Sequence, residues 1–215
     1  MDSFRIRGGR TIRGEAMVGC AKNAVLPIMA AAILSDQPTR LLDSPNLSDV
    51  KHMREILQIL GCSATMRDRE MLLDPQGLRQ YEMPDHLSKK IRSSIFLLGP
   101  ILARFRKATV TYPGGCEIGM RPIDLHLHGL RQLGVEIREE GGMIYCDGQH
   151  MHAGSVHFDY PSVGATENVM MAATLLPGTT TLHNAAREPE IADLQNFLRT
   201  MGARVSGAGT NTIAV

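Results

Sequence analysis

Apolar residues recur at helical spacing in three stretches of the chain, about seventy residues apart. Counting back from Gly61, Gly134 and Gly202, apolar residues stand at positions −11, −4 and −1 of every stretch. These offsets lie on one face of an α-helix, and a following glycine suits the left-handed residue that ends a helix. The pattern predicts amphipathic helices over residues 50–60, 123–133 and 191–201. In the second, His126 and Gly129 replace residues that are apolar in the other two.

Short runs typical of strands flank each predicted helix. One strand is expected before each helix, at 40–42, 108–112 and 179–182. Another is expected after it, at 63–66, 135–137 and 203–205, and a third at 70–73, 142–145 and 212–215. The elements follow the same order in all three stretches, which indicates an internal repeat rather than coincidence.

Each copy of the repeat also begins with an almost wholly apolar segment, at 23–34, 94–102 and 168–176. A helix that is apolar all round is buried on all sides, and no apolar run reaches the ~20 residues of a membrane span. The fold class predicted is therefore an inside-out α/β barrel, with three helix–strand repeats, buried helices and outer sheets around a pseudo-threefold axis. Pro27 and Pro100 leave open where the first two buried helices begin or kink.

Residues 1–21 stand outside the repeat, which occupies residues 22–215. Phe4-Arg5-Ile6-Arg7 alternates as a strand does. We expect this strand to pair with something other than the three-copy body.

Composition narrows the range of partners and compartments. The net charge of +1 argues against nucleic acid or a membrane surface held by bulk electrostatics. The four cysteines are scattered, with no C-x-x-C pair, and no signal peptide is visible. These features favour a reduced, cytoplasmic protein.

Polar residues open the three buried helices, at 22–23, 92–94 and 162–166. Pseudo-threefold packing would bring these N-termini to one end of the domain, where roughly half a positive charge per helix attracts phosphate or carboxylate. Capping is the expected role of Ser93, Ser94 and Thr166. Lys22 opposes the dipole of its own helix, so its position needs another reason.

Residues 113–122 read Pro-Gly-Gly-Cys-Glu-Ile-Gly-Met-Arg-Pro. The glycines permit backbone angles closed to other residues, so Cys116 is expected in a segment that can move. Pro122 suits the first turn of a helix. A thiol beside Arg121 and a helix start suggests chemistry on an anion, although the same residues could form an ordinary turn with a half-buried Cys.

Two histidine pairs, His126 with His128 and His150 with His152, invite a metal interpretation. Residues i and i+2 of a helix do not face each other, and no matching Cys or carboxylate cluster accompanies the second pair. We expect no metal and no cofactor.

Together these segments resemble the UDP-N-acetylglucosamine 1-carboxyvinyltransferases, the first committed enzymes of peptidoglycan synthesis. The resemblance is carried by Ala21-Lys22-Asn23-Ala24, Arg92-Ser93-Ser94-Ile95, residues 113–125, residues 162–166 and residues 184–191. It implies an inside-out fold with two such domains and an active site between them. Family members are about twice this long, so the chain resembles their N-terminal half. Residues 1–21 resemble the strand that joins the second domain, which is the expected partner.

The resemblance also implies a reaction and its residues. Enolpyruvyl passes from phosphoenolpyruvate to the 3′-hydroxyl of UDP-N-acetylglucosamine, by addition then elimination and without metal. Cys116 would be the general acid and the target of fosfomycin, Lys22 would hold the phosphate or carboxylate, and Asn23 the tetrahedral intermediate. The nucleotide sugar would contact Arg92, Arg121, Pro122, Ile123, Asp124, Leu125, Tyr160, Pro161, Ser162 and Val163.

Some features leave alternatives open. Cys20 stands where the family usually has glycine, and Tyr160-Pro161 where lysine and a small apolar residue are common. The family's catalytic aspartate lies in the other half, so the 215-residue chain alone is expected to be inactive or nearly so. The alternatives are a non-catalytic nucleotide-sugar-binding or interaction module, a repeat domain without ligand, and, more distantly, an enzyme like 5-enolpyruvylshikimate-3-phosphate synthase, whose family lacks the Cys loop.

Overall fold

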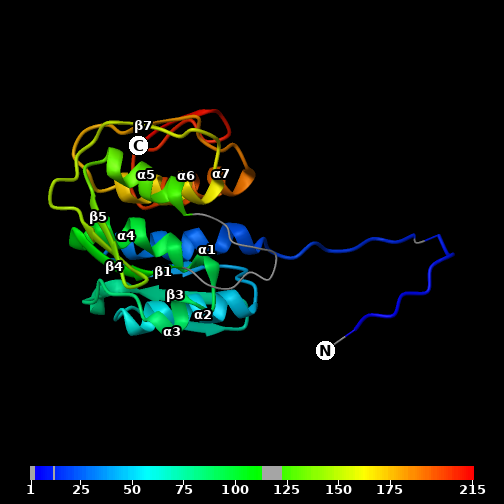
Figure 1. The fold of residues 1–215 in the computed structure, drawn as a ribbon. Coiled ribbons are helices and arrows are strands. Elements are labelled where there is room, and N and C mark those ends of the chain that lie inside the picture. Colours follow the sequence, from blue (N-terminus) through cyan, green and yellow to red (C-terminus); the bar gives the residue numbers. More distant parts are fainter. Residues whose placement is uncertain (1–2, 12, 113–122) are drawn as a thin grey trace.

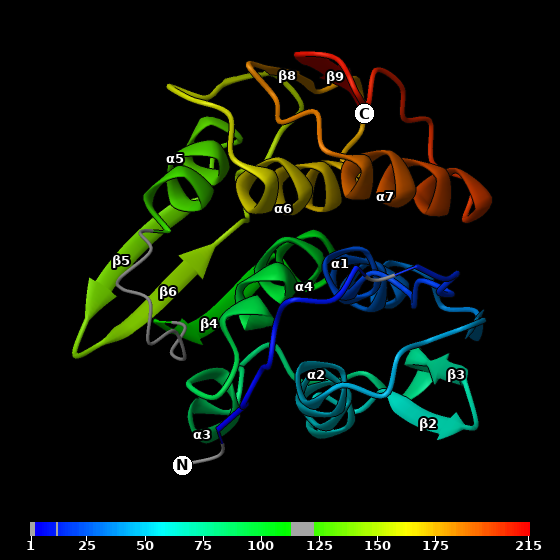
Figure 2. The same ribbon diagram turned by 90° about the vertical axis from the view of Figure 1, so that its right-hand side faces the viewer.

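Three small sheets surround a set of central helices in the computed structural model, which describes residues 3–11, 13–112 and 123–215 (Figure 1). Figure 2 shows the sheets on three sides with the helices between them. The inside-out α/β fold predicted from the repeat is therefore confirmed. The strands are β1 (Thr39–Leu41), β3 (Glu70–Asp74) and β2 (Ser63–Arg67) in the first sheet, then β4 (Lys107–Thr111), β6 (Met143–Asp147) and β5 (Glu136–Glu140), then β7 (Ser155–His157), β8 (Thr181–His183) and β9 (Thr212–Ala214), each in spatial order.

The third sheet departs from the other two. Residues 203–205 form no strand, so that prediction was wrong; Ser206 makes a single bridge to Ala214 instead. The turn that follows contains Gly207 and Gly209, both with positive φ, and this wider turn shortens the hairpin. At the other edge of β8, β7 pairs in parallel, where the second sheet has only a single parallel bridge between Glu82 and Thr109.

The helices fall into the two predicted classes. The central ones are α1 (Lys22–Ala31) with the 3-10 turn η1 (Ala32–Leu34), the 3-10 segment η3 (Arg92–Leu97) continuing into α4 (Leu98–Phe105), and α6 (Val163–Ala173). The amphipathic ones are α2 (Ser48–Ile59), α5 (Asp124–Gln132) and α7 (Pro189–Thr200). Short turns η2 (Pro75–Gly77) and α3 (Asp85–Ser88) lie in the first connection.

Helix α6 is the centre of the core. It packs against α4, α5 and α7, and even its polar residues Thr166, Glu167 and Asn168 have no exposed surface. A buried polar side chain destabilises the fold unless it is hydrogen-bonded. Each of these three residues therefore needs a specific explanation.

Asn168 joins three elements. Its Oδ1 accepts from the Gly99 N–H at 2.6 Å, and its Nδ2 donates to the Ile95 C=O at 2.8 Å. The same Nδ2 lies 3.0 Å from Nδ1 of His126 in α5. A Cβ on Gly99 would come within 2.5 Å of the Asn168 Oδ1, so the contact also requires glycine there. These bonds fix α6 against α4 and α5.

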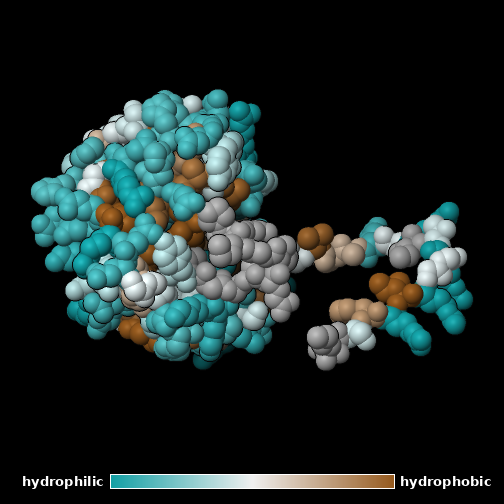
Figure 3. All heavy atoms as spheres, viewed as in Figure 1, coloured by the Kyte–Doolittle hydropathy of each residue, from teal (hydrophilic) through white to brown (hydrophobic). Residues whose placement is uncertain are grey.

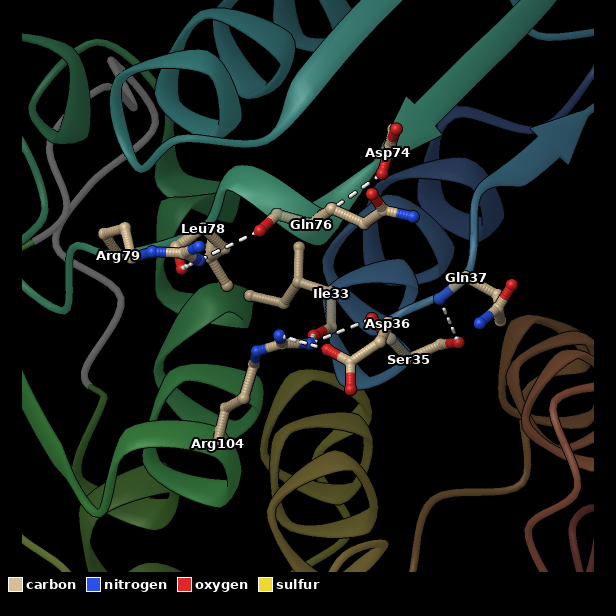
Figure 4. A network of polar contacts seen from close by, with 9 residues as sticks. All are labelled: Ile33, Ser35, Asp36, Gln37, Asp74, Gln76, Leu78, Arg79 and Arg104. Carbon is tan, nitrogen blue, oxygen red and sulfur yellow. Dashed lines mark hydrogen bonds and ion pairs between the residues drawn. The ribbon is translucent and has the colours of Figure 1, made fainter.

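Arg104, near the end of α4, ties the first two copies together at the opposite end of the core (Figure 4). Its guanidinium donates to the carbonyls of Ile33 and Ser35 at 2.8 and 2.9 Å, and pairs with Asp36. Carbonyls at a helix end lack partners within the helix. Arg104 supplies donors for two of them, the Ile33 carbonyl beyond the end of α1 and the Ser35 carbonyl beyond the end of η1.

The N-terminal segment extends away from the body without packing on it. Phe4, Ile6, Met17 and Val18 are each at least 89% exposed, and Figure 3 shows this segment projecting free of the rest. Its pairing with another domain stays a prediction. Within the ranges that the structure describes, none of the helices combines the length and apolar character of a membrane crossing.

We predict that Asn168→Ala lowers the free energy of unfolding by about 3 kcal/mol, because it removes the acceptor of the buried Gly99 N–H and leaves a cavity at the centre of the core. Urea denaturation followed by circular dichroism measures this. Asn211→Ala, on an exposed turn, is the matched control and should change stability by less than about 0.5 kcal/mol. Equal effects of the two substitutions would contradict the role given to Asn168.

Candidate functional site

A pocket of about 490 Å³ lies where the N-termini of α1, η3 and α6 meet. It is lined by predicted site residues from each of the three: Lys22 and Asn23, Arg92, and Ser162 with Val163. The convergence that the sequence predicts is thus present in the fold. Unpaired N–H groups and helix dipoles make such an end favourable for an anion.

An ion pair with Asp49 explains why Lys22 can stand at a helix N-terminus, where a cation opposes the helix dipole. Its Nζ lies 2.8 Å from Oδ2 of Asp49, in the first turn of α2. Both side chains are partly exposed, at 48% and 31%, and such a pair contributes only about 0–1 kcal/mol. A bound phosphate or carboxylate can therefore compete with Asp49 for the Lys22 ammonium group.

The hydroxyls at these helix starts have different roles from those expected. Ser162 caps α6, accepting from the Ala165 N–H at 3.4 Å. Ser94 instead donates to the carbonyls of Ser88 and Ile91, and Thr166 accepts from the Ala186 N–H. The capping predictions for Ser94 and Thr166 were wrong, because both side chains are buried and serve carbonyl or amide groups of neighbouring loops.

Ser93 does not cap its helix either, since no side-chain cap is formed at η3. Its buried Oγ lines the pocket and has no hydrogen-bond partner among the described residues. A buried hydroxyl without a partner costs free energy, so this oxygen is available to a ligand.

Glu167 is a pocket residue that the sequence reasoning missed. It is fully buried, it lines the pocket, and neither carboxylate oxygen has a hydrogen-bond partner within the described residues. Burial, together with the nearby carboxylates of Glu190 and Glu188, raises the pKa of Glu167 from 4.5 to about 9. Glu167 is therefore a neutral acid at pH 7, able to donate a hydrogen bond. The signal was available, because Glu167 is the one charged residue in this helix.

His126 lines the same pocket as a neutral imidazole. Burial, with a further contribution from the Arg92 cation, lowers the pKa of His126 from 6.5 to about 3. Its contact with Asn168 explains why a histidine occupies a position that is apolar in the other two copies. Within the described residues, no three metal-ligating side chains gather into a group that could hold an ion.

The remaining predicted residues are placed elsewhere. Ile123 and Leu125 are buried in the core at the start of α5, and Asp124 is exposed between them. Tyr160 and Pro161 are exposed and do not line the pocket. Cys116, Arg121 and Pro122 lie outside the described residues.

Comparison with solved structures gives the fold class. The enolpyruvyl transferase NikO from Streptomyces tendae superposes with a TM-score of 0.83 at 23% identity, over 96% of this chain and 49% of that one. EPSP synthase from Acinetobacter baumannii superposes with a TM-score of 0.73 at 18% identity, over 94% of this chain and 47% of that one. At these identities the likeness establishes the fold of an enolpyruvyl transferase domain.

The sequence gives the family. Residues 6–215 match the profile of EPSP synthase (3-phosphoshikimate 1-carboxyvinyltransferase), and the chain belongs to this family of enolpyruvyl transferases. It is 52% identical over 215 residues to UDP-N-acetylglucosamine 1-carboxyvinyltransferase 2 of Caldanaerobacter subterraneus subsp. tengcongensis, and 47% identical to UDP-N-acetylglucosamine 1-carboxyvinyltransferase 1 of Carboxydothermus hydrogenoformans. The whole chain is matched in both cases, against 52% and 51% of the relatives. The chain thus spans about half the length of these curated relatives, and the resemblance found in its motifs is confirmed.

We predict that Glu167 makes stability fall as pH rises. Between pH 4.5 and about 9 the folded protein keeps a proton on Glu167 that the unfolded chain releases. The contribution of this proton to the free energy of unfolding is therefore complete below pH 4.5, and it is lost as the pH rises to about 9. At pH 8, Glu167→Gln should increase the free energy of unfolding, on the order of 2–4 kcal/mol, and remove most of this slope. Urea titrations at pH 5 and pH 8 measure it.

The control for this experiment is Glu55→Gln, at an exposed position of α2. It should leave both the stability and its slope with pH close to those of the unsubstituted chain. A Glu167→Gln variant with an unchanged slope would show that Glu167 is not a buried neutral acid.

Proposed function

We propose that this chain forms the nucleotide-sugar side of an enolpyruvyl transferase that acts on phosphoenolpyruvate and UDP-N-acetylglucosamine. The observation that carries the proposal is the pocket at which three helix N-termini converge with Lys22, Asn23 and Arg92. The names of the relatives at 52% and 47% identity supply the substrate class. The proposal includes a role in peptidoglycan synthesis, hence in cell-wall biogenesis, cell shape, the cell cycle and cell division, and a cytoplasmic location.

The reaction would proceed in two steps, an addition and an elimination. In the addition, the 3′-oxygen of the sugar bonds to C2 of phosphoenolpyruvate, its proton leaves to a base, and C3 receives a proton from the Cys116 thiol. In the elimination, C3 loses a proton, the C2–O bond to phosphate breaks, and the enol double bond forms again. In this proposal Lys22 holds the phosphate or carboxylate and Asn23 the tetrahedral intermediate. Arg92, residues 121–125 and residues 160–163 contact the nucleotide sugar.

The described pocket supports this chemistry electrostatically. Phosphoenolpyruvate carries a phosphate and a carboxylate, and its addition product remains strongly anionic. Fixed cations and donors that face such a charge stabilise it most where water is excluded. Lys22, Lys90 and Arg92 line this volume together with the Ser93 hydroxyl and the protonated Glu167, so the pocket offers three cations and two neutral hydrogen-bonding groups.

We expect the 215-residue chain to bind the nucleotide sugar weakly and to turn over little or not at all, because the proposal places the base and further arginines on a second domain. A non-catalytic nucleotide-sugar-binding module would give the same binding. Phosphate release on mixing the chain with both substrates and a second domain favours the transferase; binding without release under those conditions favours the module.

We predict that the chain binds UDP-N-acetylglucosamine and that Arg92→Met weakens this binding about tenfold or more, since a charge-assisted hydrogen bond is lost. Isothermal titration calorimetry measures the affinity. Lys89→Met is the matched control, because Lys89 pairs with Asp85 outside the pocket, and it should leave affinity unchanged.

Ser93→Ala provides a second variant should Arg92→Met fold poorly, and it should weaken binding without lowering stability. Equal affinity in all variants would contradict the proposed site. Tighter binding of shikimate 3-phosphate than of UDP-N-acetylglucosamine would favour the sister activity instead.

A further inference from the structure

Two of the three fully buried polar side chains of α6 have a structural role, and the third does not. Thr166 accepts from the Ala186 N–H at 3.1 Å, and Asn168 holds α6 against α4 and α5. Within the part of the chain that the structure describes, neither carboxyl oxygen of Glu167 has a hydrogen-bond partner. The packing of α6 therefore explains Thr166 and Asn168 but gives no reason for a carboxyl group at position 167.

The carboxyl group of Glu167 lies at the pocket where the helix N-termini meet. Glu167 stands one turn inside the start of α6 and lines this pocket together with Lys22, Asn23 and Ser93. The buried Ser93 Oγ, at the start of η3, also lacks a partner among the described residues. A buried polar group without a partner destabilises the fold. A ligand in the pocket that accepts hydrogen bonds would supply the missing partner for both side chains.

The surroundings of Glu167 keep it protonated. Burial raises its pKa to about 9, and the carboxylates of Glu190, in the first turn of α7, and Glu188, just before α7, add to this shift. None of the ion pairs among the described residues includes Glu167. The Lys22 ammonium group pairs with Asp49 instead. Loss of the proton would therefore place an unpaired negative charge in the core.

Other charged and titratable groups reach this end of α6 from the elements packed around it. Those that line the pocket are Lys22 from α1, Asp49 from α2, Lys90 and Arg92 at the start of η3, His126 from α5 and Glu190 from α7. Helix α4 adds none, since its one charged residue, Arg104, binds carbonyls at the opposite end of the core. With Glu167 protonated, three cations stand against two carboxylates. Ionisation of Glu167 would cancel this excess of positive charge.

We propose that Glu167 is a specificity-determining residue of this pocket, and that its protonated carboxyl group donates a hydrogen bond to an oxygen of a bound phosphate group. This role rests on the proposed function and deepens it, because it concerns the same pocket. A neutral carboxyl group can donate, whereas an ionised one only accepts and repels an anion. Helix N-termini and cations attract any anion. A phosphate group has enough acceptor oxygens to meet the Glu167 and Ser93 hydroxyls as well.

The direct test is the reciprocity between the proton on Glu167 and bound phosphate. If the protonated form binds phosphate better, phosphate must in turn favour the protonated form. The carboxyl ¹³C resonance of Glu167, followed in labelled protein from pH 8 to pH 10, reports this protonation. Inorganic phosphate, added at constant ionic strength, should raise the midpoint of the titration by about half a pH unit or more. An unmoved or lowered midpoint would overturn the proposal.

Two substitutions separate the hydrogen bond from the shape of the side chain. Glu167→Gln keeps a donor and cannot ionise, so its affinity for inorganic phosphate at pH 8 should stay within about threefold of the unsubstituted chain. Glu167→Met fills a similar volume without a donor and should bind about tenfold more weakly. Methyl chemical shifts of Val163 and Ala165 measure the dissociation constants. Glu55→Gln, at an exposed position of α2, is the matched control and should bind as the unsubstituted chain does.

The dependence on pH isolates the titration of Glu167 from that of the lysines. Between pH 8 and pH 9.5, phosphate binding should weaken about fourfold more in the unsubstituted chain than in Glu167→Gln, because the proton is lost near pH 9 only in the former. Equal affinities of the Gln and Met variants would overturn the proposal, since cations and helix N-termini alone would then hold the phosphate.

The source of the phosphate group is found by titrating UDP and phosphoenolpyruvate separately into the Gln and Met variants. The ligand whose affinity falls in Glu167→Met carries the phosphate that meets Glu167, and no loss with either ligand would count against the proposal. The measurements with inorganic phosphate use no nucleotide sugar. They can therefore fail while UDP-N-acetylglucosamine still binds, so the failure of this role and the failure of the proposed function are distinguishable.

Discussion

The burial of three helices that are apolar all round is the constraint on which this structure depends. Helices α1, α4 and α6 have no polar face to present to water, so the sheets must lie outside them. The polar residues of these helices stand at the helix ends or, in α6, are buried in the core. Asn168 fixes the packing of α6 against α4 and α5. The consequence of this arrangement is that three N-termini share one pocket, and the pocket's preference for anions follows from the same packing that makes the core.

The balance of charges in the pocket has two parts with different physical origins. Lys22 is held by a partly exposed ion pair with Asp49, which an anionic ligand can displace at small cost. Glu167 is held neutral by burial, which removes a negative charge from the site without removing the carboxyl group. Both features make the pocket more favourable to an anion than its count of acidic residues would suggest. The proposed transfer chemistry uses this excess of donors and cations.

Much of the fold could be predicted because the repeat appears three times in the sequence. The spacing of apolar residues before Gly61, Gly134 and Gly202 predicted three amphipathic helices, and α2, α5 and α7 occupy those positions within a few residues. The strand at 203–205 failed because strand propensity ignores the wider glycine-containing turn that follows it. Parallel segment β7 was missed because Ser155-Val156-His157 is too short to stand out without its neighbour β8.

The site was less predictable than the fold. Helix starts could be read from residues 22–23, 92–94 and 162–166, but not which hydroxyl would cap. Ser94 turns inward to the carbonyls of Ser88 and Ile91, and Thr166 turns inward to the Ala186 N–H. Glu167 was overlooked because it lies between the polar opening at 162–166 and the apolar segment at 168–176, and a single acid gives no periodic signal. Only its burial reveals its protonation.

We infer that the N-termini of α1, η3 and α6 form one anion site, which a phosphate titration followed by amide chemical shifts can check. Amides of Asn23 to Leu26, Ser93 to Ile95 and Val163 to Ala165 should shift together and fit a single dissociation constant. Shifts confined to one of these helices, or spread over surface lysines without saturation, would contradict it.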